Sequence, residues 1–188
     1  LKSRWVKWRK QAEDFNQNNK NVKRGVGCGS AWYGCGNTSL SNPSTIRVGI
    51  NGEGKLTLYN VAMDIGQGTN TIMVQICADA LGLPASQFEY VMGDTDLTAD
   101  AGKTSASRQA FVSGKATQLA GEHLRGQIIQ LAEASENATL YLEQNGSVGS
   151  GKLIVEDEAG EHVIVLADIL PQTNGDVLTV EGTFDPPT

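Results

Sequence analysis

Ile65-Gly66-Gln67-Gly68-Thr69-Asn70-Thr71 is the stretch around which the rest of the sequence is arranged. This first loop, residues 65–71, follows a strand-like segment at 55–61 and precedes apolar residues at helical spacing. A helix begins with unpaired backbone N–H groups and the positive end of the helix dipole. Glycines let that backbone approach a ligand closely, and Thr and Asn side chains add donors. The stretch predicts either an anion-binding helix start or an ordinary helix cap.

A second loop of the same kind is Gly102-Lys103-Thr104-Ser105-Ala106-Ser107-Arg108-Gln109. These residues, 102–109, also precede an apolar pattern with helical spacing, which predicts a long helix over 105–135. Either loop alone is most simply a helix cap. Two such helix starts in one short segment favour a shared cradle for an anionic, phosphate-bearing group.

The remaining elements follow from periodicity and turn residues. Asn51-Gly52-Glu53-Gly54 predicts a hairpin between strands at 45–50 and 55–61. We further expect a helix at 70–83, a strand at 88–92, a hairpin of 153–155 with 162–166, a short helix at 167–170 and a strand at 176–183. This order predicts an α+β fold in which helices pack on a mixed or antiparallel sheet.

The N-terminal segment is predicted to be separate from this layer structure. Trp5, Trp8, Ala12 and Phe15 recur at steps of three and four, which predicts an amphipathic helix over 1–15. Its aromatic face is more typical of docking to a protein than of a membrane surface. We therefore expect a helix and linker at 1–21 and an incomplete α+β domain at 22–188. Within that domain the Gly-rich residues 24–37 predict a strand with close backbone neighbours.

The net charge of −6 is unevenly distributed along the 188 residues, which are enough for one domain or two small ones. Residues 1–24 carry eight Lys or Arg and two acidic residues, giving +6, and the rest of the chain carries −12. An acidic body argues against a nucleic-acid groove. We expect no nucleic-acid partner.

Nothing in the sequence predicts a membrane or secretory location. There is neither a run of about 18 apolar residues nor an apolar segment after the basic N-terminus, so no membrane span or signal peptide is expected. Cys28, Cys35 and Cys77 form no C-x-x-C pair, and we expect reduced, mostly buried thiols in a cytoplasmic protein. The first residue is Leu1 rather than Met, which favours a piece of a longer protein.

Asp94-Thr95-Asp96-Leu97-Thr98 matches D-x-D-x-T, a pattern of haloacid-dehalogenase-type phosphatases. No later strand ends in the paired acids that would hold magnesium, and a calcium loop would need Gly at Ala99 and Glu at Ser105. We favour turn acids that order the second loop, with a phosphatase as a third alternative. Glu122 and His123 lack a second His for a zinc site and are expected on a solvated helix face.

Several of these segments together resemble the molybdenum-cofactor-binding subunit of the xanthine dehydrogenase/aldehyde oxidase family. The resemblance rests on residues 64–71 with Val74-Gln75, on 93–96, on 104–108 and on Lys23-Arg24-Gly25-Val26-Gly27, followed by the hairpin in the same order. It covers residues 22–125 well and the rest loosely. Members of that family hydroxylate an aldehyde or an electron-poor N-heterocycle with oxygen from water, and pass the electrons through iron–sulfur clusters, commonly to a flavin.

The resemblance implies a role for both loops. Gln67 would hydrogen-bond the pterin or the ligands of molybdenum, Ala106 would lie close to the metal, and Arg108 could pair with a phosphate. The expected cofactor-binding residues are Gly66, Gln67, Gly68, Thr69, Asn70, Thr71, Thr104, Ser105, Ala106, Ser107 and Arg108. None of them is expected to ligate the metal directly. The cofactor would be molybdenum-molybdopterin, in the mononucleotide or the cytosine dinucleotide form.

The sequence also departs from that family. It has no Gly-Val-Gly-Glu segment with the general-base glutamate, no Gly-Gly-x-Phe-Gly loop, no arginine-bearing loop upstream, and no cysteine runs for iron–sulfur clusters. We therefore expect no catalytic residue here and an inactive isolated chain. Its partners would be the remainder of the molybdenum-binding subunit, iron–sulfur and FAD-containing subunits or domains, and a small-molecule substrate. The alternative is a non-catalytic α+β module that binds a phosphorylated ligand, or docks a partner through the Trp5/Trp8 face.

Overall fold

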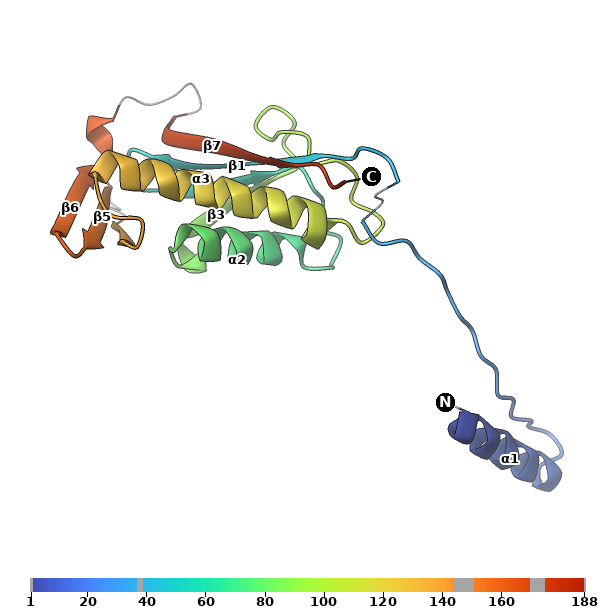
Figure 1. The fold of residues 1–188 in the computed structure, drawn as a ribbon. Helices are drawn as coiled ribbons and strands as arrows, with labels where there is room; N and C mark the ends of the chain where they lie inside the picture. Colours follow the sequence, from blue (N-terminus) through green and yellow to red (C-terminus); the bar gives the residue numbers. More distant parts are fainter. Residues whose placement is uncertain (1, 37–38, 144–150, 170–174, 188) are drawn as a thin grey trace. The chain divides into compact units, whose positions relative to one another are not determined.

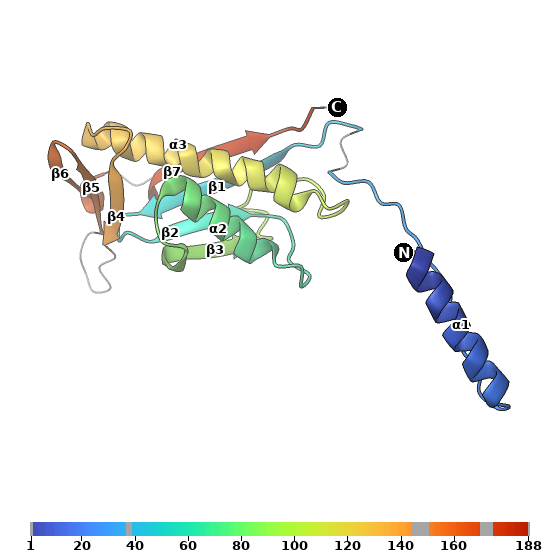
Figure 2. The same cartoon turned by 60° about the horizontal axis from the view of Figure 1, so that its bottom comes forward.

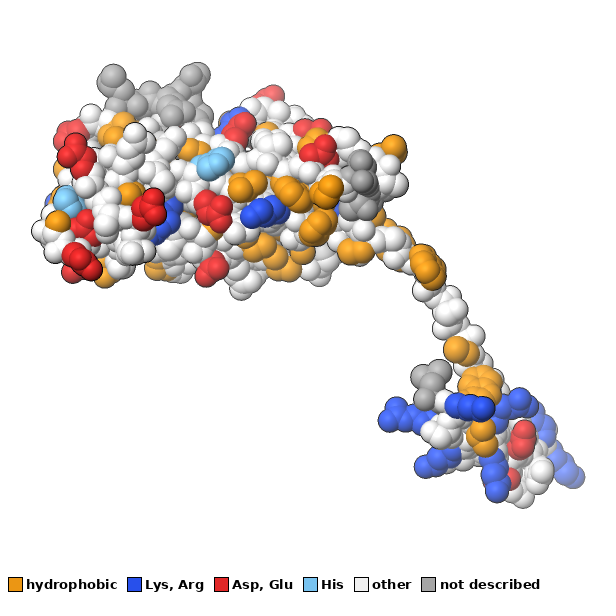
Figure 3. Space-filling view, viewed as in Figure 1, with side chains coloured by type: hydrophobic (Ala, Val, Ile, Leu, Met, Phe, Trp, Pro, Cys, Tyr) orange, Lys and Arg blue, Asp and Glu red, His pale blue; other side chains and the backbone are white. Residues whose placement is uncertain are grey.

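The computed structural model describes residues 2–36, 39–143, 151–169 and 175–187. The chain divides into two compact units, Leu1–Tyr33 and Gly34–Thr188, and each is described by itself. The boundary expected from the sequence, after residue 21, stays a prediction. Figure 3 shows Lys and Arg side chains concentrated on the N-terminal helix, and more acidic than basic side chains on the larger unit, as the charge distribution predicts.

Helix α1 (Lys2–Asn18) confirms the predicted N-terminal helix and extends it by almost a turn. Asn16 and Arg24 exchange two hydrogen bonds, Asn16 Nδ2 to the Arg24 carbonyl at 2.8 Å and Arg24 N–H to Asn16 Oδ1 at 2.7 Å. The Arg24 guanidinium lies 3.8 Å from the centroid of the Phe15 ring. The chain is thus folded back against the C-terminal end of α1, while Trp8 is 47% exposed. Docking of a partner on this face stays a prediction.

The strand predicted over 24–37 is wrong for the residues that the structure describes. Residues 22–34 form no helix and no strand. A Cβ added at Gly25, Gly27 or Gly29 would meet no atom within 4 Å, so the close backbone neighbours that we expected are missing here. A β-strand is held by its partner strand, and Gly-rich segments without one gain nothing from an extended pairing geometry.

The larger unit is built on a four-stranded mixed sheet, with the strand order β3-β2-β1-β7. Strands β1 (Ser44–Asn51) and β2 (Leu56–Asn60) form the predicted hairpin, with Val48 opposite Leu58. Strand β7 (Asp176–Phe184) pairs antiparallel with β1, and β3 (Phe88–Met92) pairs parallel with β2. The parallel pair requires a crossover, which α2 supplies. The predicted α+β class is confirmed.

Helices α2 (Thr69–Leu81) and α3 (Gly114–Ala132) lie side by side on one face of this sheet (Figures 1 and 2). Alternate strand residues face them and are fully buried: Ile46, Val48, Ile50, Leu56 and Leu58. Gly182 of β7 lies against α3, and a Cβ there would overlap the Ala116 carbonyl and the Ala120 backbone nitrogen. Small residues on both elements therefore bring helix and strand unusually close. A one-turn 3₁₀ helix, η1 (Ala85–Gln87), precedes β3.

The long helix begins later than the sequence predicts. A π-helical turn, η2 (Gln109–Ser113), leads into α3, which ends at Ala132 before Glu133 in a left-handed conformation. Residues 105–108 are therefore loop rather than helix. Ala106 and Ser107 have φ of 53° and 52°, a left-handed conformation that cannot continue into a right-handed helix.

A second, antiparallel sheet lies at the end of the domain away from both loops (Figures 1 and 2). It contains β4 (Thr139–Glu143), β5 (Lys152–Asp157) and β6 (Gly160–Val165). The β5–β6 hairpin was predicted, but β4 was not, although Leu140 and Leu142 alternate with exposed residues. The predicted short helix at 167–170 is a 3₁₀ turn, η3 (Leu166–Asp168), and residue 170 lies outside the described residues.

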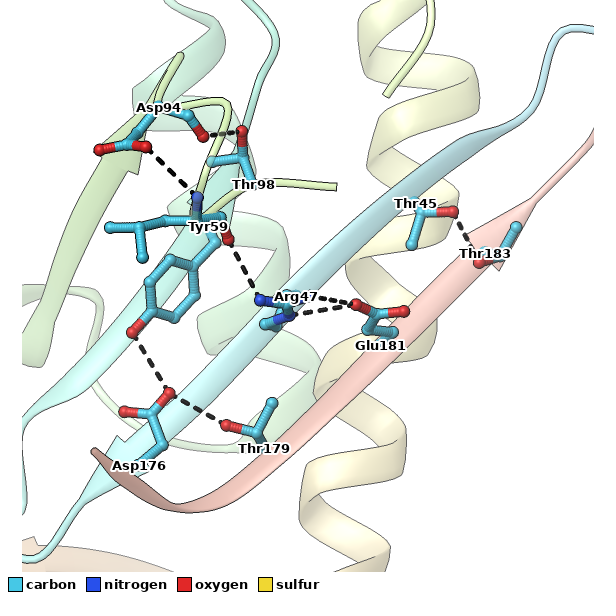
Figure 4. Close-up of polar contacts among 10 residues, drawn as sticks. Thr45, Arg47, Tyr59, Asp94, Thr98, Asp176, Thr179, Glu181 and Thr183 are labelled. Atoms are coloured by element: carbon cyan, nitrogen blue, oxygen red, sulfur yellow. Dashed lines mark hydrogen bonds and ion pairs between the residues drawn. The ribbon is translucent and has the colours of Figure 1, made fainter. Parts of the chain in front are cut away.

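The other face of the four-stranded sheet is polar (Figure 4). Arg47 Nη2 lies 2.7 Å from Glu181 Oε1 on the neighbouring strand, and Arg47 Nη1 donates to the Leu97 carbonyl at 3.2 Å. Tyr59 donates to Asp176 Oδ2 at 3.2 Å. The bond to Leu97 holds the segment after β3 against the sheet, and the other two join β7 to β1 and β2.

Candidate functional site

The first loop is closed around the carboxylate of Asp64. Its Oδ1 accepts hydrogen bonds from the backbone N–H groups of Gly66 (2.9 Å) and Gly68 (3.3 Å), and its Oδ2 accepts one from Asn70 (3.0 Å). The bonds from Asn70 and Gly66 hold the pKa of Asp64 below its usual range, since they favour the charged form. The start of α2 thus already has an anion, supplied by the chain itself.

Gln67 folds back into the same loop. Its Oε1 accepts from the Ile65 N–H at 2.6 Å, and its Nε2 donates to the Met63 carbonyl at 2.9 Å and to Thr69 Oγ1 at 2.8 Å. The flanking Gly66 and Gly68 have φ of 101° and 80°, which L-residues rarely adopt. No atom lies within 4 Å of a Cβ added at either glycine, so the outer surface of the loop is open.

The second loop is shaped by Arg108, whose side chain is fully buried. One terminal nitrogen of its guanidinium donates to the carbonyls of Ala101 (2.6 Å) and Lys103 (3.0 Å), and the other donates to those of Asn42 (2.7 Å) and Pro43 (3.3 Å). Its charge therefore faces the interior of the loop, whereas Ser105 and Ser107 are exposed.

The structure brings the two loops together at one end of the domain (Figures 1 and 2). The Met63 N–H donates to Thr104 Oγ1 at 3.2 Å, which joins the residues leading into the first loop to the second loop. Met92, at the end of β3, accepts at its sulfur from Asp64 N–H (3.4 Å) and from Asn70 Nδ2 (3.3 Å). Residues from three segments of the sequence thus form one hydrogen-bonded group.

Two amide oxygens in this region are buried without a hydrogen-bond partner among the described residues. They are Oδ1 of Asn70, in the first turn of α2, and Oε1 of Gln109, the last residue of the second loop. Buried polar atoms are nearly always hydrogen-bonded, so an unpaired acceptor here suits a ligand that carries N–H donors. Thr69 is buried, and Thr71 is exposed on the first turn of α2.

The D-x-D-x-T segment forms a turn. Asp94 Oδ1 accepts from the backbone N–H groups of Asp96 at 2.9 Å and Leu97 at 3.3 Å, an Asx-turn that shapes residues 94–98. Across the described parts of the chain, no three His, Cys, Asp or Glu side chains are grouped so that they could hold a metal ion. This geometry fits turn acids better than a phosphatase nucleophile.

Two other expectations need correction or refinement. Only Cys77 is buried, and burial raises the pKa of its thiol to about 12, whereas Cys28 and Cys35 are exposed. The expectation of mostly buried thiols is therefore wrong. His123 is exposed as expected, but its Nδ1 lies 3.1 Å from the carbonyl oxygen of Glu181, so it contacts the edge of the sheet.

Comparison with known protein families assigns the sequence to one family. The profile of the molybdopterin cofactor-binding domain matches residues 1–186. The chain belongs to this family. The family is a molybdopterin cofactor-binding domain.

The relatives of this chain are much longer proteins, and each match covers only a part of the relative. The chain is 30% identical over 138 residues to the xanthine dehydrogenase of Calliphora vicina, a match that spans 73% of this chain and 10% of that protein. It is 27% identical over 173 residues to the putative xanthine dehydrogenase molybdenum-binding subunit of Escherichia coli, which spans 86% of this chain and 21% of the subunit. The chain therefore spans about a fifth, or less, of the length of these relatives.

Solved structures share the fold of the molybdopterin-binding domain. A Cu,Mo-CO dehydrogenase superposes on 82% of this chain and 21% of its own, with a TM-score of 0.56 and 23% identity. The aldehyde oxidoreductase from Desulfovibrio desulfuricans superposes on 82% of this chain and 14% of its own, with a TM-score of 0.54 and 24% identity. Among the described residues, no helix has the length and apolar character to cross a membrane.

Sequence reasoning gave no role to two residues of the molybdopterin-binding domain that the structure places in the site. Asp64 stands two residues before a glycine, a spacing typical of an Asx-turn, so the sequence itself contains a signal for the capping of the loop by Asp64. The unpaired oxygen of Gln109 had none, because its burial depends on how the second loop folds.

Proposed function

We propose that this chain is the cofactor-binding portion of a molybdenum hydroxylase of the xanthine dehydrogenase/aldehyde oxidase type. The whole enzyme would oxidise an aldehyde or an N-heterocycle with oxygen derived from water. The observation that carries the proposal is the hydrogen bond from Met63 to Thr104, which joins the two loops in a chain that belongs to the molybdopterin-binding family.

The two loops would bind different parts of the cofactor. The exposed amide of Gln67, with the backbone of Gly66 and Gly68, would face the pterin or the metal's ligands, and would exchange one of its loop hydrogen bonds for a bond to the cofactor. The unpaired oxygens of Asn70 and Gln109 would accept from N–H donors of the pterin. When bound, the cofactor supplies the redox chemistry, and the protein supplies positioning and hydrogen bonds.

The phosphate end would lie at the second loop. Asp64 already occupies the start of α2, and an anion beside its carboxylate would be repelled. Thr104 and the exposed Lys103, Ser105 and Ser107 offer a cation and hydroxyl groups instead. Ala106 would lie near the metal. Arg108 would act by holding the loop's shape, because its terminal nitrogens are bonded to carbonyls.

Other parts of the enzyme would lie outside this chain. The catalytic base and the substrate-contacting residues would come from the remainder of the molybdenum-binding subunit, and iron–sulfur and FAD-containing domains or subunits would carry the electrons away. Both the mononucleotide and the cytosine dinucleotide form of the cofactor fit an exposed second loop. We further propose a cytoplasmic location and an isolated chain that does not turn over substrate.

The test uses the native assembly purified from cells. Its molybdenum would be measured by elemental analysis, with Gln67→Ala as the variant and Gln75→Ala, an exposed residue of α2, as the matched control. We expect molybdenum near one per assembly in the wild type and the control, and a lower molybdenum content in Gln67→Ala, because loss of a group around a metal weakens cofactor binding by about 10-fold. An intact assembly without molybdenum would favour the non-catalytic phosphate-binding module.

A further inference from the structure

We infer that Asp64 is a positioning residue, which holds the first loop in its cofactor-binding shape before the cofactor arrives. The inference rests on the proposed function and names a residue to which neither the family match nor the proposal above assigns that role. The carboxylate is not placed against the cofactor. It acts through the backbone that carries Gln67.

The contacts of the carboxylate span the whole turn. Gly66, Gly68 and Asn70 each direct a backbone N–H to it, so one side chain fixes the entry, the middle and the helical end of the loop. Without this acceptor, three backbone N–H groups would lose their partner, one in the turn, one at the N-cap and one in the first turn of α2. The loop could then satisfy them only by changing shape or by binding water.

Asp64 is itself held on both sides. Its own N–H donates to the sulfur of Met92 at the end of β3, and the preceding Met63 donates to Thr104 of the second loop. These bonds connect the carboxylate to the sheet and to the second loop. Asp64 therefore links the Gly-x-Gly turn to β3 and, through its neighbour Met63, to the second loop.

The direction of Gln67 depends on this arrangement. The groups that hold its amide are the Met63 carbonyl and the Ile65 N–H, on either side of Asp64, together with Thr69 at the start of α2. If the turn loosens, all three move relative to one another. Pre-organisation of this kind raises affinity because less ordering remains to be done on binding.

The experiment compares Asp64→Asn and Asp64→Ala in the native assembly. Asparagine keeps one oxygen for Gly66 and Gly68 but turns an NH₂ group toward the Asn70 N–H, whereas alanine removes every acceptor. We expect faster hydrogen–deuterium exchange of a peptide spanning residues 62–72, and a loss of molybdenum, both larger for Ala than for Asn. A fall of about 10-fold in cofactor affinity for Ala matches the effect of groups that support a metal site indirectly.

Asp157→Asn is the matched control. Asp157 also accepts two backbone N–H bonds, from Ser135 and Ala159 at 2.8 Å each, but in the β5–β6 hairpin at the other end of the domain. It should lower stability without changing exchange in 62–72 or the molybdenum content. Equal loss of molybdenum in Asp157→Asn would overturn the inference, because general destabilisation would then explain the result.

Normal exchange and full molybdenum in Asp64→Ala would also overturn it. That outcome leaves the proposed function standing if Gln67→Ala still loses molybdenum. A wild-type assembly without molybdenum would instead remove the proposed function, and exchange in 62–72 alone would then decide whether Asp64 orders the loop. If Asp64→Ala does not accumulate in cells, Asp64→Asn carries the test.

Discussion

Arg108 shows how backbone carbonyls can accommodate a buried positive charge. Its guanidinium is completely buried, and its two terminal nitrogens donate to four backbone carbonyls from two segments of the chain. Several carbonyl dipoles together replace the water that a cation loses on burial. The carbonyls belong to residues 101–103 and 42–43, which are irregular, and Arg108 joins these two segments.

Replacing Arg108 should therefore destabilise the domain strongly. In Arg108→Met the side chain keeps much of its length but donates nothing. Each buried carbonyl left without a donor costs about 1–3 kcal/mol, so we expect the free energy of unfolding to fall by about 3 kcal/mol or more. Urea unfolding of the purified chain measures this, with the exposed Lys103→Met in the same loop as control. A loss no larger than that of the control would contradict the assigned role.

At the scale of elements, the second loop decides where the long helix begins. The left-handed Ala106 and Ser107 turn the chain, and the π-helical turn at Gln109–Ser113 follows before α3 becomes regular. At this same end of the domain, the chain before β1 is held by side chains rather than by strand pairing. Asp185, just after β7, accepts from the Asn42 N–H at 2.9 Å and from the Ser41 hydroxyl. The chain before β1 is thus tied to the end of β7.

This contact should make stability depend on pH. The bond from Ser41, followed by that from Asn42, holds the pKa of Asp185 below its usual range. A lowered folded-state pKa means that the ionised group stabilises the fold above its unfolded pKa of about 3.9, and that this contribution disappears as the pH falls through the folded value. We expect Asp185→Asn to be less stable than wild type at pH 7.

The difference between Asp185→Asn and wild type should shrink as the pH falls below the unfolded pKa of about 3.9, and should disappear as the pH falls through the lowered folded pKa of Asp185. Unfolding measured across this pH range gives the comparison. Asp79→Asn, an exposed position on α2, serves as the control and should show no such trend. A difference that is constant from pH 7 to pH 3 would show that the charge of Asp185 does not stabilise the contact.

At the scale of the whole molecule, the chain consists of a basic helical unit and an acidic α+β unit. The first carries most of the positive charge, and the residues that lead out of it toward Gly34 form no helix or strand. The second contains both sheets, α2, α3 and the two loops. Its core is built from residues of the second unit, so this unit should remain folded when the first is removed.

Limited trypsin digestion tests that division. Lys20, Lys23 and Arg24 are exposed and precede residue 34, whereas Arg47 lies within a central strand. We expect every early cut to fall before residue 34 and a resistant fragment that contains residues 34–188. Mass spectrometry of the products identifies the cuts. Cleavage at Arg47 as early as at Arg24 would mean that the second unit is not stable by itself.

The sequence by itself determined the elements whose signals are local. The hairpin at Asn51-Gly52-Glu53-Gly54, the helix ending at Gly82 and the strand at 88–92 each follow from turn residues and periodicity within a few positions. The resemblance also identified the family, because its motif residues lie close together in the sequence.

Only the tertiary structure decided how the charges of the site are used. Arg108 donates to carbonyls that include that of Asn42, 66 residues away in the sequence. Which partner a charged group finds depends on what folding brings near it, and no local pattern encodes that. For the same reason the strand predicted at 24–37 failed: a strand forms only when a second strand lies beside it.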